Sequence, residues 1–277
     1  MTSSFSVIGS GEASGKSPSF FFLSPDQQYI LKSCTARDVK TLTHMLSSYR
    51  DHVKSCAIST DTNNAGGNAA VSSTNSSLLP RYLGLYKLTF QDHTPDVTLV
   101  VMTNFFAAAH EIHCKFDLKG STYHREASEK ERAKSAPVYN WMREGRKIRF
   151  ETEDEVKHVK ERLEKDTLFL SSQNLIDYSL LVGIHETKEG TTNVRHVREH
   201  MDVVSAKSSM GIQYFGLVDI LTPFVAQKRL ETICTGTLIC RPGISCQPPK
   251  KYQERFMSFV DEEVLACTGT STGAGDS

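Results

Sequence analysis

The chain contains 277 residues, of which 39% are hydrophobic and 23% are charged, which is enough apolar material for one large domain or two small lobes. Its 32 Lys and Arg residues balance its 32 Asp and Glu residues, so the overall basic field typical of non-specific nucleic-acid binding is excluded and we predict no nucleic-acid partner. No run approaches the about 18 apolar residues of a membrane span, and the N-terminus lacks a signal-peptide pattern, so we expect a cytoplasmic protein that meets membranes only at their surface.

The first part of the chain is rich in predicted strands. Aromatic and β-branched residues gather in short runs between turn residues, which predicts a hairpin that ends at Lys32 and two further strands. These strands cover residues 5–8, 19–32, 81–90 and 97–106. Apolar residues at helical spacing predict a helix over 36–53. The polar, low-complexity segment at about 55–77 predicts a disordered insert, because it offers too little apolar surface to offset its ordering entropy.

The second part mixes helices with strands. Thr152 and Glu155 form a capping-box pattern, which predicts a helix over 153–172. Apolar runs predict strands over 113–118, 178–186 and 212–220, and a last helix is expected over 248–266. The remaining stretches, which we expect to be irregular, are 188–210 and 222–247.

This order of elements predicts an α+β protein with two lobes. An antiparallel sheet with one helix would form the N-terminal lobe, over residues 1–103. A mixed C-terminal lobe would follow over residues 104–277, and a nucleotide would bind in the cleft between the lobes.

Three ionisable residues stand where phosphoryl transfer would need them. Such a reaction requires a lysine on the nucleotide phosphates, carboxylates for Mg²⁺ and a carboxylate near the attacking hydroxyl. Lys32 ends a predicted strand after a Gly- and Ser-rich segment, and Asp38 in the next helix is a candidate ion-pair partner. Asp177 and Asp219 are isolated carboxylates in or beside apolar runs, where burying an unpaired charge is costly. A solvated lysine and carboxylates that cap turns remain the competing interpretation.

A second basic pair lies in the segment FDLKGSTYHREAS. Lys119 and Arg125 flank a turn that Gly120 and Ser121 shape, and basic groups beside such a turn suit an anionic ligand. A solvated charged face is the alternative interpretation of the charges that follow.

Five segments together resemble the phosphatidylinositol phosphate kinase family. FDLKGSTYHREAS (116–128), LIDYSLLVGIHE (175–186) and YFGLVDILTPF (214–224) are similar, in this order, to its signature segments. LLPRYLGLYKL (78–88) and VVMTNFF (100–106) are similar to the strands that lead to its hinge. The resemblance implies a two-lobed lipid-kinase fold that uses ATP and Mg²⁺ to phosphorylate an inositol headgroup that already carries a phosphate.

The resemblance also implies roles for matching residues. Asp177 would be the catalytic carboxylate near the attacking hydroxyl, and Lys119 would support the transferred phosphate. Asp219 would bind Mg²⁺, and Arg125 would hold the phosphate already on the substrate ring. The residues that would contact ATP are Gly15, Ser17 and Lys32 near the phosphates, and Met102, Thr103 and Asn104 at the adenine hinge.

In this family the loop after the metal-binding aspartate meets the membrane and helps to select the substrate. The matching segment, at about 222–247 and extending to 251, carries five basic residues and one acidic residue. These are Lys228, Arg229, Arg241, Lys250, Lys251 and Glu231, and the apolar residues that could insert beside them are Phe224, Val225, Leu230 and Ile233. We expect reversible binding to an anionic surface on the cytosolic face, with the plasma membrane as the predicted location.

The segment KRLE, which contains Lys228, Arg229 and Glu231, resembles that of type I enzymes, which phosphorylate the 5-position of phosphatidylinositol 4-phosphate. Type II enzymes have alanine where Glu231 falls, although REASEKERAK and DYSLLVGIHE are more similar to type II. We therefore predict the 5-hydroxyl of phosphatidylinositol 4-phosphate as the acceptor, which would give phosphatidylinositol 4,5-bisphosphate. Kinases that act on the 5-phosphate or 3-phosphate lipid remain alternatives.

Two departures from the family pattern leave further alternatives open. Pro18 stands where the family has a glycine, and proline lacks the backbone donor that would hold a phosphate. The family also has more sequence before the first strand, which is often used for dimerisation, so a homodimer stays undecided. The rival functions are a non-catalytic phosphoinositide-binding homologue and a kinase for soluble inositol phosphates.

Overall fold

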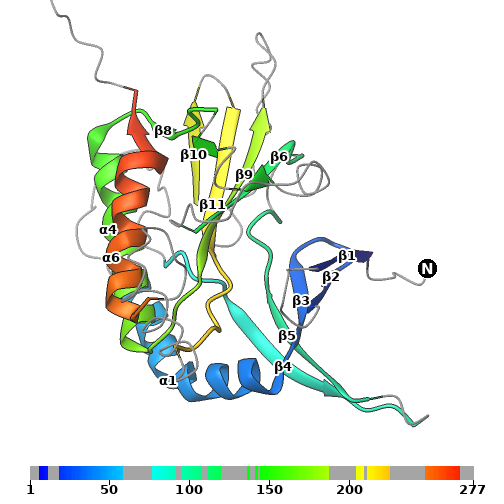
Figure 1. Cartoon of the computed structure of the whole chain (residues 1–277). Helices are drawn as coiled ribbons and strands as arrows, with labels where there is room; N and C mark the ends of the chain where they lie inside the picture. Colours follow the sequence, from blue (N-terminus) through cyan, green and yellow to red (C-terminus); the bar gives the residue numbers. More distant parts are fainter. Residues whose placement is uncertain are drawn as a thin grey trace, which may run out of the picture.

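The computed structural model combines two five-stranded sheets with helices (Figure 1). It describes residues 6–11, 19–58, 77–91, 95–107, 111–119, 136–137, 141–142, 144–186, 204–208, 211–224 and 247–268. The predicted mixture of helices and antiparallel sheet is confirmed.

The N-terminal sheet has the order β1-β2-β3-β5-β4, and every neighbouring pair is antiparallel. Its strands are β1 (Ser6–Gly11), β2 (Ser19–Leu23), β3 (Tyr29–Cys34), β4 (Tyr82–Leu88) and β5 (Val97–Thr103). The turn between β2 and β3 is closed by Ser24, whose hydroxyl donates to Asp26 at 2.6 Å and accepts from the backbone of Tyr29 at 3.0 Å. This turn places Lys32 in the middle of β3, between the residues that face it on β2 and β5.

Helix α1 (Ala36–Ile58) follows β3 directly. Its first turn is capped reciprocally, because Asp38 accepts from the Thr35 backbone at 2.9 Å and the Thr35 hydroxyl accepts from the Asp38 backbone at 3.2 Å. The helix runs beyond its predicted end at residue 53, so the predicted disordered insert is wrong over residues 55–58. Contacts of His52 with Asp166 and Phe169 of a later helix, described below, support this extension. Residues 59–76 of the insert lie outside the described residues.

The C-terminal sheet has the order β10-β11-β9-β6-β7, antiparallel except between β6 and β7. Its strands are β6 (Cys114–Leu118), β7 (Ala136–Pro137), β9 (Ser179–Glu186), β10 (Val204–Ser208) and β11 (Gly211–Val218). β10 lies in a stretch predicted to be irregular, and that prediction is wrong there. Gly211 explains the strand, since its φ of 138° allows a tight return and a Cβ there would lie 2.0 Å from the carbonyl oxygen of His185.

Helices α4 (Glu153–Ser172) and α6 (Pro249–Phe259) lie side by side along one flank of the C-terminal sheet (Figure 1). The predicted bounds of α4 and its capping box at Thr152 are confirmed. The prediction of one helix over 248–266 is wrong at its end. After α6 the chain forms a π-helical turn, η2 (Val260–Val264), and then strand β12 (Leu265–Cys267), which pairs in parallel with β8 (Ile148–Phe150).

Among the described residues, one apolar core joins the two sheets. It includes Leu42 and Met45 of α1, Val100 of β5, Leu180 of β9 and Phe256 of α6, each at most 4% exposed. Helix α1 therefore belongs to the same packed interior as the C-terminal sheet. Within the described part of the chain, no helix combines the length and apolarity needed to cross a bilayer.

Asp166 of α4 joins α1 to the C-terminal part of the molecule. This fully buried carboxylate contacts His52 Nε2 at 2.6 Å through one oxygen and accepts from the backbone of Leu78 at 2.6 Å through the other. Burial is the largest single effect and lowers the pKa of His52, but hydrogen bonding and charge interactions with Asp166 and Cys56 together outweigh it, and the pKa rises to about 9. The His52 ring also stacks on Phe169, with 4.5 Å between ring centroids.

Candidate functional site

Strands β6 and β11 end, and strand β9 begins, along the same edge of the C-terminal sheet. This arrangement brings candidate residues together. The register pairs Val218 of β11 with Ser179 of β9, and Leu118 of β6 with Leu180 of β9. Lys119 directly follows β6, Asp219 directly follows β11, and Asp177 precedes β9 by two residues. Strand pairing therefore gathers three of the predicted site residues at one edge of this sheet.

Lys119 and Asp177 form the more buried of two ion pairs. Lys119 Nζ lies 3.4 Å from Asp177 Oδ1, and each side chain is 11% exposed. A buried charge is tolerated when it is paired, so each residue compensates the cost of burying the other. The pair therefore places a carboxylate beside an ammonium group in a largely buried environment.

Lys32 and Asp219 form the second pair, which connects the two sheets. Lys32 Nζ lies 2.7 Å from Asp219 Oδ1, and 5.3 Å from the centroid of the Phe21 ring. The suggested partner Asp38 is therefore wrong, because that carboxylate caps α1 instead. The expectation that Asp219 is a buried carboxylate is also wrong, since its side chain is 45% exposed where the chain leaves β11.

Both aspartates occupy the left-handed region of backbone conformation. The φ angle is 66° at Asp177 and 59° at Asp219, a conformation that aspartate adopts more readily than most residues other than glycine. In this conformation each carboxylate follows a sharp change in chain direction at a strand end. Such outliers persist only where surrounding structure holds them, and they are concentrated at functional sites.

Backbone hydrogen bonds fasten the two aspartate-bearing segments to each other. The Ile176 amide donates to the Thr222 carbonyl at 2.9 Å, and the Phe224 amide donates to the Asn174 carbonyl at 2.9 Å. Phe224 is thereby drawn into the core and is 7% exposed. The expectation that Phe224 could insert into a membrane is therefore wrong.

Tyr252 supports the segment at Asp177 through Tyr178, and no local sequence pattern predicts this role. Its hydroxyl donates to the carbonyl of Tyr178 at 2.5 Å, and the two rings meet edge to face with centroids 4.8 Å apart. Both side chains are fully buried. Because Tyr178 adjoins Asp177, this bond helps to fix the strained turn that carries the carboxylate.

The predicted adenine hinge spans the end of β5, and the backbone amides of Thr103 and Asn104 are already engaged. The amide of Thr103 donates to the carbonyl of Arg81 at 3.0 Å, and the amide of Asn104 donates to the carbonyl of Gln28 at 2.9 Å. Asn104 also donates from its side chain to Gln27 at 2.8 Å. Met102 pairs with residues on both neighbouring strands. A base bound at this place would therefore need other partners, or a change at these bonds.

Two aromatic residues after the hinge pack against glycines of the C-terminal sheet, and the sequence did not single them out for this contact. A Cβ placed on Gly216 would lie 2.5 Å from the Phe105 ring, and one on Gly183 would lie 2.6 Å from the Phe106 ring. The glycines thus leave room for both rings on adjacent strands. This contact sets the position of the chain between the two sheets.

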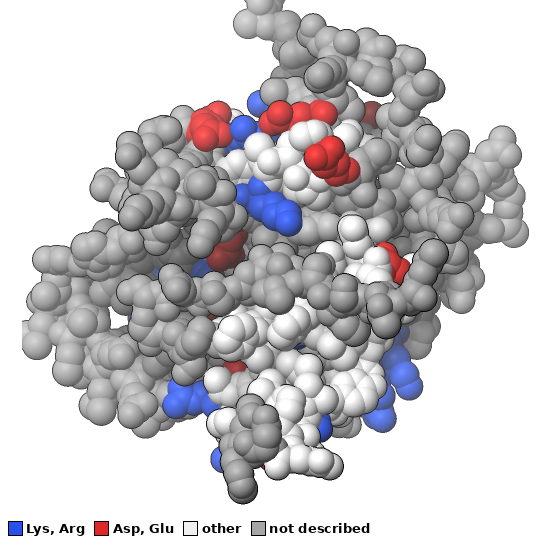
Figure 2. Space-filling view, turned by 90° about the vertical axis from the view of Figure 1, so that its right-hand side faces the viewer, with Lys and Arg blue, Asp and Glu red and all other residues white. Residues whose placement is uncertain are grey.

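Six of the predicted site residues lie outside the described residues, so the structure assigns them no position. These are Gly15, Ser17, Arg125, Lys228, Arg229 and Glu231. On the face shown in Figure 2, the described Lys, Arg, Asp and Glu side chains are interspersed and do not gather in one patch of a single sign.

The residues at this edge suit Mg²⁺. This ion prefers oxygen ligands and is commonly held by one or two carboxylates together with substrate phosphates. The carboxylate of Asp219 is accessible and lies beside an ammonium group that could move to a phosphate. Asp219 is therefore the residue that would hold the ion, while Asp177 remains engaged by Lys119.

Comparison with known proteins identifies a family that this sequence matches. The model of the family described as Phosphatidylinositol-4-phosphate 5-Kinase matches residues 4–61, 69–211 and 195–263.

Similar proteins include three vertebrate enzymes. Phosphatidylinositol 5-phosphate 4-kinase type-2 gamma of Danio rerio is 27% identical over 303 residues, covering 89% of this chain and 68% of the relative. The type-2 beta enzyme of Homo sapiens is 31% identical over 305 residues, and the type-2 alpha enzyme of Sus scrofa is 34% identical over 298 residues. Both of these alignments cover 90% of this chain and 68% of the relative.

Proposed function

The chain belongs to the phosphatidylinositol phosphate kinase family, and on this basis we propose that the Lys32–Asp219 and Lys119–Asp177 pairs carry its transfer of the ATP γ-phosphate to a phosphoinositide. The convergence of these two pairs is the observation that carries the assignment. Each pair joins a lysine ammonium group, which can bind phosphate oxygens, to a carboxylate. Phosphoryl transfer needs both kinds of group.

The nucleotide would lie between the two sheets, where Lys32 reaches Asp219. In this arrangement Lys32 binds phosphate oxygens through its ammonium group, which moves away from the Asp219 carboxylate. Asp219 then holds Mg²⁺, which when bound neutralises phosphate charge. The accessible positions of Lys32 and Asp219 support this exchange, with side chains 20% and 45% exposed.

Asp177 would act on the acceptor hydroxyl. Its carboxylate orients the hydroxyl and accepts its proton as the new oxygen–phosphorus bond forms and the bond to ADP breaks. Lys119 pairs with Asp177 and, once the γ-phosphate approaches, supports the transferred group. Arg125 would hold the phosphate already on the ring, as predicted from the resemblance.

The relatives favour phosphatidylinositol 5-phosphate as the substrate, with the 4-hydroxyl as the acceptor. The three described above are named phosphatidylinositol 5-phosphate 4-kinases, and they align over about nine-tenths of this chain. Glu231 supports the second candidate, the 5-hydroxyl of phosphatidylinositol 4-phosphate, because type I enzymes resemble this chain at that position. That substrate stays a prediction.

The test is phosphate transfer from ATP and Mg²⁺ to vesicles that contain the 3-, 4- or 5-phosphate lipid separately. The position of the new phosphate is read by separating the deacylated products. Asp177→Asn should lower the rate by about 10²–10⁴-fold. The matched control is Asp51→Asn, because Asp51 is 62% exposed and pairs only with its neighbour Arg50 among the contacts described. Absence of product from all three lipids, with ATP still bound, would favour the non-catalytic homologue.

We further propose that the enzyme works at the cytosolic face of a membrane through the segment after Asp219. The basic residues of 228–251 support this, at roughly 1 kcal/mol for each one near an anionic surface. Cosedimentation with vesicles of increasing phosphatidylserine content should rise with anionic lipid and fall with salt. Equal binding to neutral vesicles would exclude this electrostatic contribution.

A further inference from the structure

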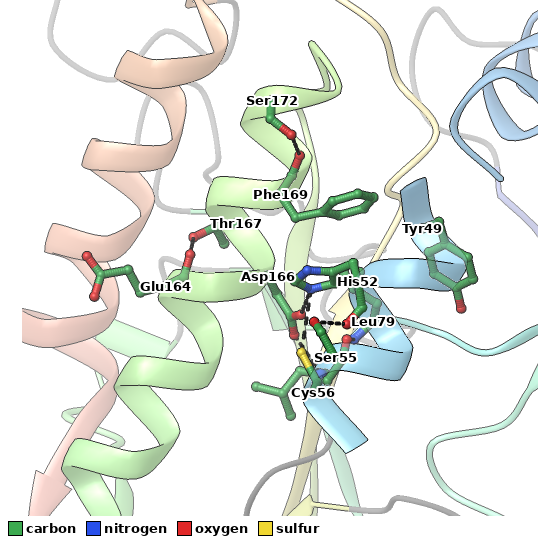
Figure 3. Close-up of polar contacts among 12 residues, drawn as sticks. Tyr49, His52, Ser55, Cys56, Leu79, Glu164, Asp166, Thr167, Phe169 and Ser172 are labelled. Carbon is green, nitrogen blue, oxygen red and sulfur yellow. Dashed lines mark hydrogen bonds and ion pairs between the residues drawn. The ribbon is translucent and has the colours of Figure 1, made fainter. Parts of the chain in front are cut away.

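Three potential metal ligands converge where α1 meets α4, away from the two ion pairs of the candidate site. They are the imidazole of His52, the thiol of Cys56 and the carboxylate of Asp166, whose ligand atoms all lie within 4.8 Å of one another. Figure 3 shows His52 and Cys56 projecting from α1 toward Asp166 on α4. Nitrogen, sulfur and oxygen are thus presented together at a half-buried to buried position.

The helix geometry explains this convergence. His52 and Cys56 are four residues apart, so their side chains lie on the same face of α1, one turn from each other. Cys56 Sγ lies 3.9 Å from His52 Nε2, and His52 Nε2 lies 2.6 Å from Asp166 Oδ1. Helix α4 supplies the third ligand from a point 114 residues away from His52 in the sequence.

These separations are close to those of a tetrahedral zinc site. With Zn–S near 2.3 Å and Zn–N and Zn–O near 2.0–2.2 Å, neighbouring ligands lie on the order of 3.3–3.7 Å apart. The observed nitrogen–oxygen contact would have to widen and the nitrogen–sulfur contact to shorten, each by a fraction of an ångström. Because Asp166 is fully buried and held by the Leu78 backbone, rotations about the side-chain bonds of half-buried His52 and Cys56 would have to supply this change.

Surrounding groups already orient two of the ligands. The second oxygen of Asp166 accepts from the Leu78 backbone at 2.6 Å, and the ring of His52 stacks on Phe169 at an interplanar angle of 13°. Partners of this kind fix ligand orientation in metal sites. A thiolate with an imidazole also selects zinc over Mg²⁺, which prefers oxygen ligands alone.

We propose that His52, Cys56 and Asp166 bind one zinc ion that fastens helix α1 to helix α4. Three bonds form, from zinc to Nε2, Sγ and Oδ1, and a water molecule completes the coordination. The protons on Nε2 and Sγ pass to solvent, and no oxidation or reduction occurs. The ion replaces the direct hydrogen bond between His52 and Asp166.

The position of this site gives it a structural consequence. Helix α1 starts directly after β3, the strand that carries Lys32, and ends near the zinc ligands. α4 packs on α6 and belongs to the C-terminal part of the molecule. Zinc would therefore resist separation of the two parts by holding the far end of α1.

Cobalt substitution tests the site directly, without any measurement of kinase activity. The full chain is treated with chelator and titrated with Co²⁺, and thiolate coordination is read as a charge-transfer band in the near ultraviolet. We expect one equivalent per chain, displacement of the band by Zn²⁺, and loss of the band in Cys56→Ser. The matched control is Cys267→Ser, because Cys267 is also a half-buried cysteine but lies in β12.

A second variant keeps the result decisive if Cys56→Ser folds poorly. His52→Phe retains an aromatic ring for stacking on Phe169 while removing the nitrogen ligand, and it should weaken Zn²⁺ binding by more than about 100-fold. Added Zn²⁺ should raise the melting temperature of the chelator-treated parent and of Cys267→Ser but not of His52→Phe. The absence of a band in the parent, or a band that persists in Cys56→Ser, would overturn the proposal. In either case His52 and Asp166 would form only a hydrogen-bonded ion pair without a metal ion. The proposed kinase function would be unaffected.

Discussion

Lys32 and Asp219 lie 2.7 Å apart although 187 residues separate them in the sequence. Lys32 comes from β3 of the N-terminal sheet and Asp219 from the end of β11 in the C-terminal sheet. The ion pair thus marks the place where the two sheets meet through charged groups, next to the buried pair of Lys119 and Asp177.

Replacing Asp219 with asparagine should abolish turnover and leave the fold nearly intact. The carboxylate would hold Mg²⁺ in the proposed mechanism, and the amide cannot supply the same charge. Its contact with Lys32 is partly exposed, so the loss of free energy of unfolding should be at most about 1 kcal/mol. Initial rates and thermal melting measure the two effects, and a wild-type rate would remove Asp219 from the metal site.

Replacing Glu231 with alanine should shift substrate preference from the 4-phosphate toward the 5-phosphate lipid. In the family resemblance described above, type II enzymes have alanine where Glu231 falls, whereas type I enzymes have a similar glutamate. The measurement is the ratio of kcat/KM for the two lipids in mixed vesicles, compared with the parent. An unchanged ratio would show that Glu231 does not determine the choice of lipid.

Removing the hydroxyl group of Tyr178 and removing that of Tyr252 should have different effects on the free energy of unfolding. The Tyr178 hydroxyl is buried and finds no hydrogen-bond partner among the described residues, and burial raises the pKa of this phenol. Tyr178→Phe should therefore leave the free energy of unfolding unchanged or raise it. Tyr252→Phe should lower it by about 1–3 kcal/mol, because the Tyr178 carbonyl loses its donor.

Denaturant unfolding of the two variants provides the comparison, since both remove one oxygen from a fully buried ring. Tyr252→Phe should also lower kcat, because its hydroxyl helps to fix the turn at Asp177. A larger loss of stability in Tyr178→Phe than in Tyr252→Phe would mean that the Tyr178 hydroxyl has a strong partner after all.

Gly216→Ala should destabilise the protein through the Phe105 ring. The added methyl group would lie 2.5 Å from that ring, and overpacking of this kind costs about 1–3 kcal/mol. In a Phe105→Ala background the same change should cost much less, because the obstructing ring is gone. Unfolding free energies of the parent, both single variants and the double variant measure this coupling. If the losses of unfolding free energy simply add in the double variant, the contact between Gly216 and Phe105 is not the cause of the destabilisation.

Local sequence signals predicted the helices and strands whose ends are marked by nearby residues, such as capping residues and turn residues. Thr152 and Glu155 marked the start of α4, and the β-rich runs around Lys32 and before Asp219 marked β3 and β11. β10 was missed because its polar residues carry no alternating pattern and its pairing depends on the turn at Gly211. β12 was missed because its partner, β8, lies over a hundred residues earlier in the chain.

The residues that meet at the candidate site were easier to predict than their contacts. Lys32, Lys119, Asp177 and Asp219 were singled out by residue type and position, yet Lys32 was assigned the wrong partner. Asp38 is close in sequence, but the free amide at the start of α1 engages it first. The contact of Asp166 with His52 joins residues 114 positions apart, and no local pattern reports such a contact.

The placement of Lys32 within β3 has a consequence for changes in chain length. β2 and β5 both pair with this strand, with Phe21 and Val100 opposite Lys32. Neighbouring residues of a strand face opposite sides, so a deletion or insertion of one residue in the turn at 24–28 would tend to present Leu31 or Ser33 in place of the lysine. We expect this turn to accept exchanges of residue type more readily than changes in its number of residues.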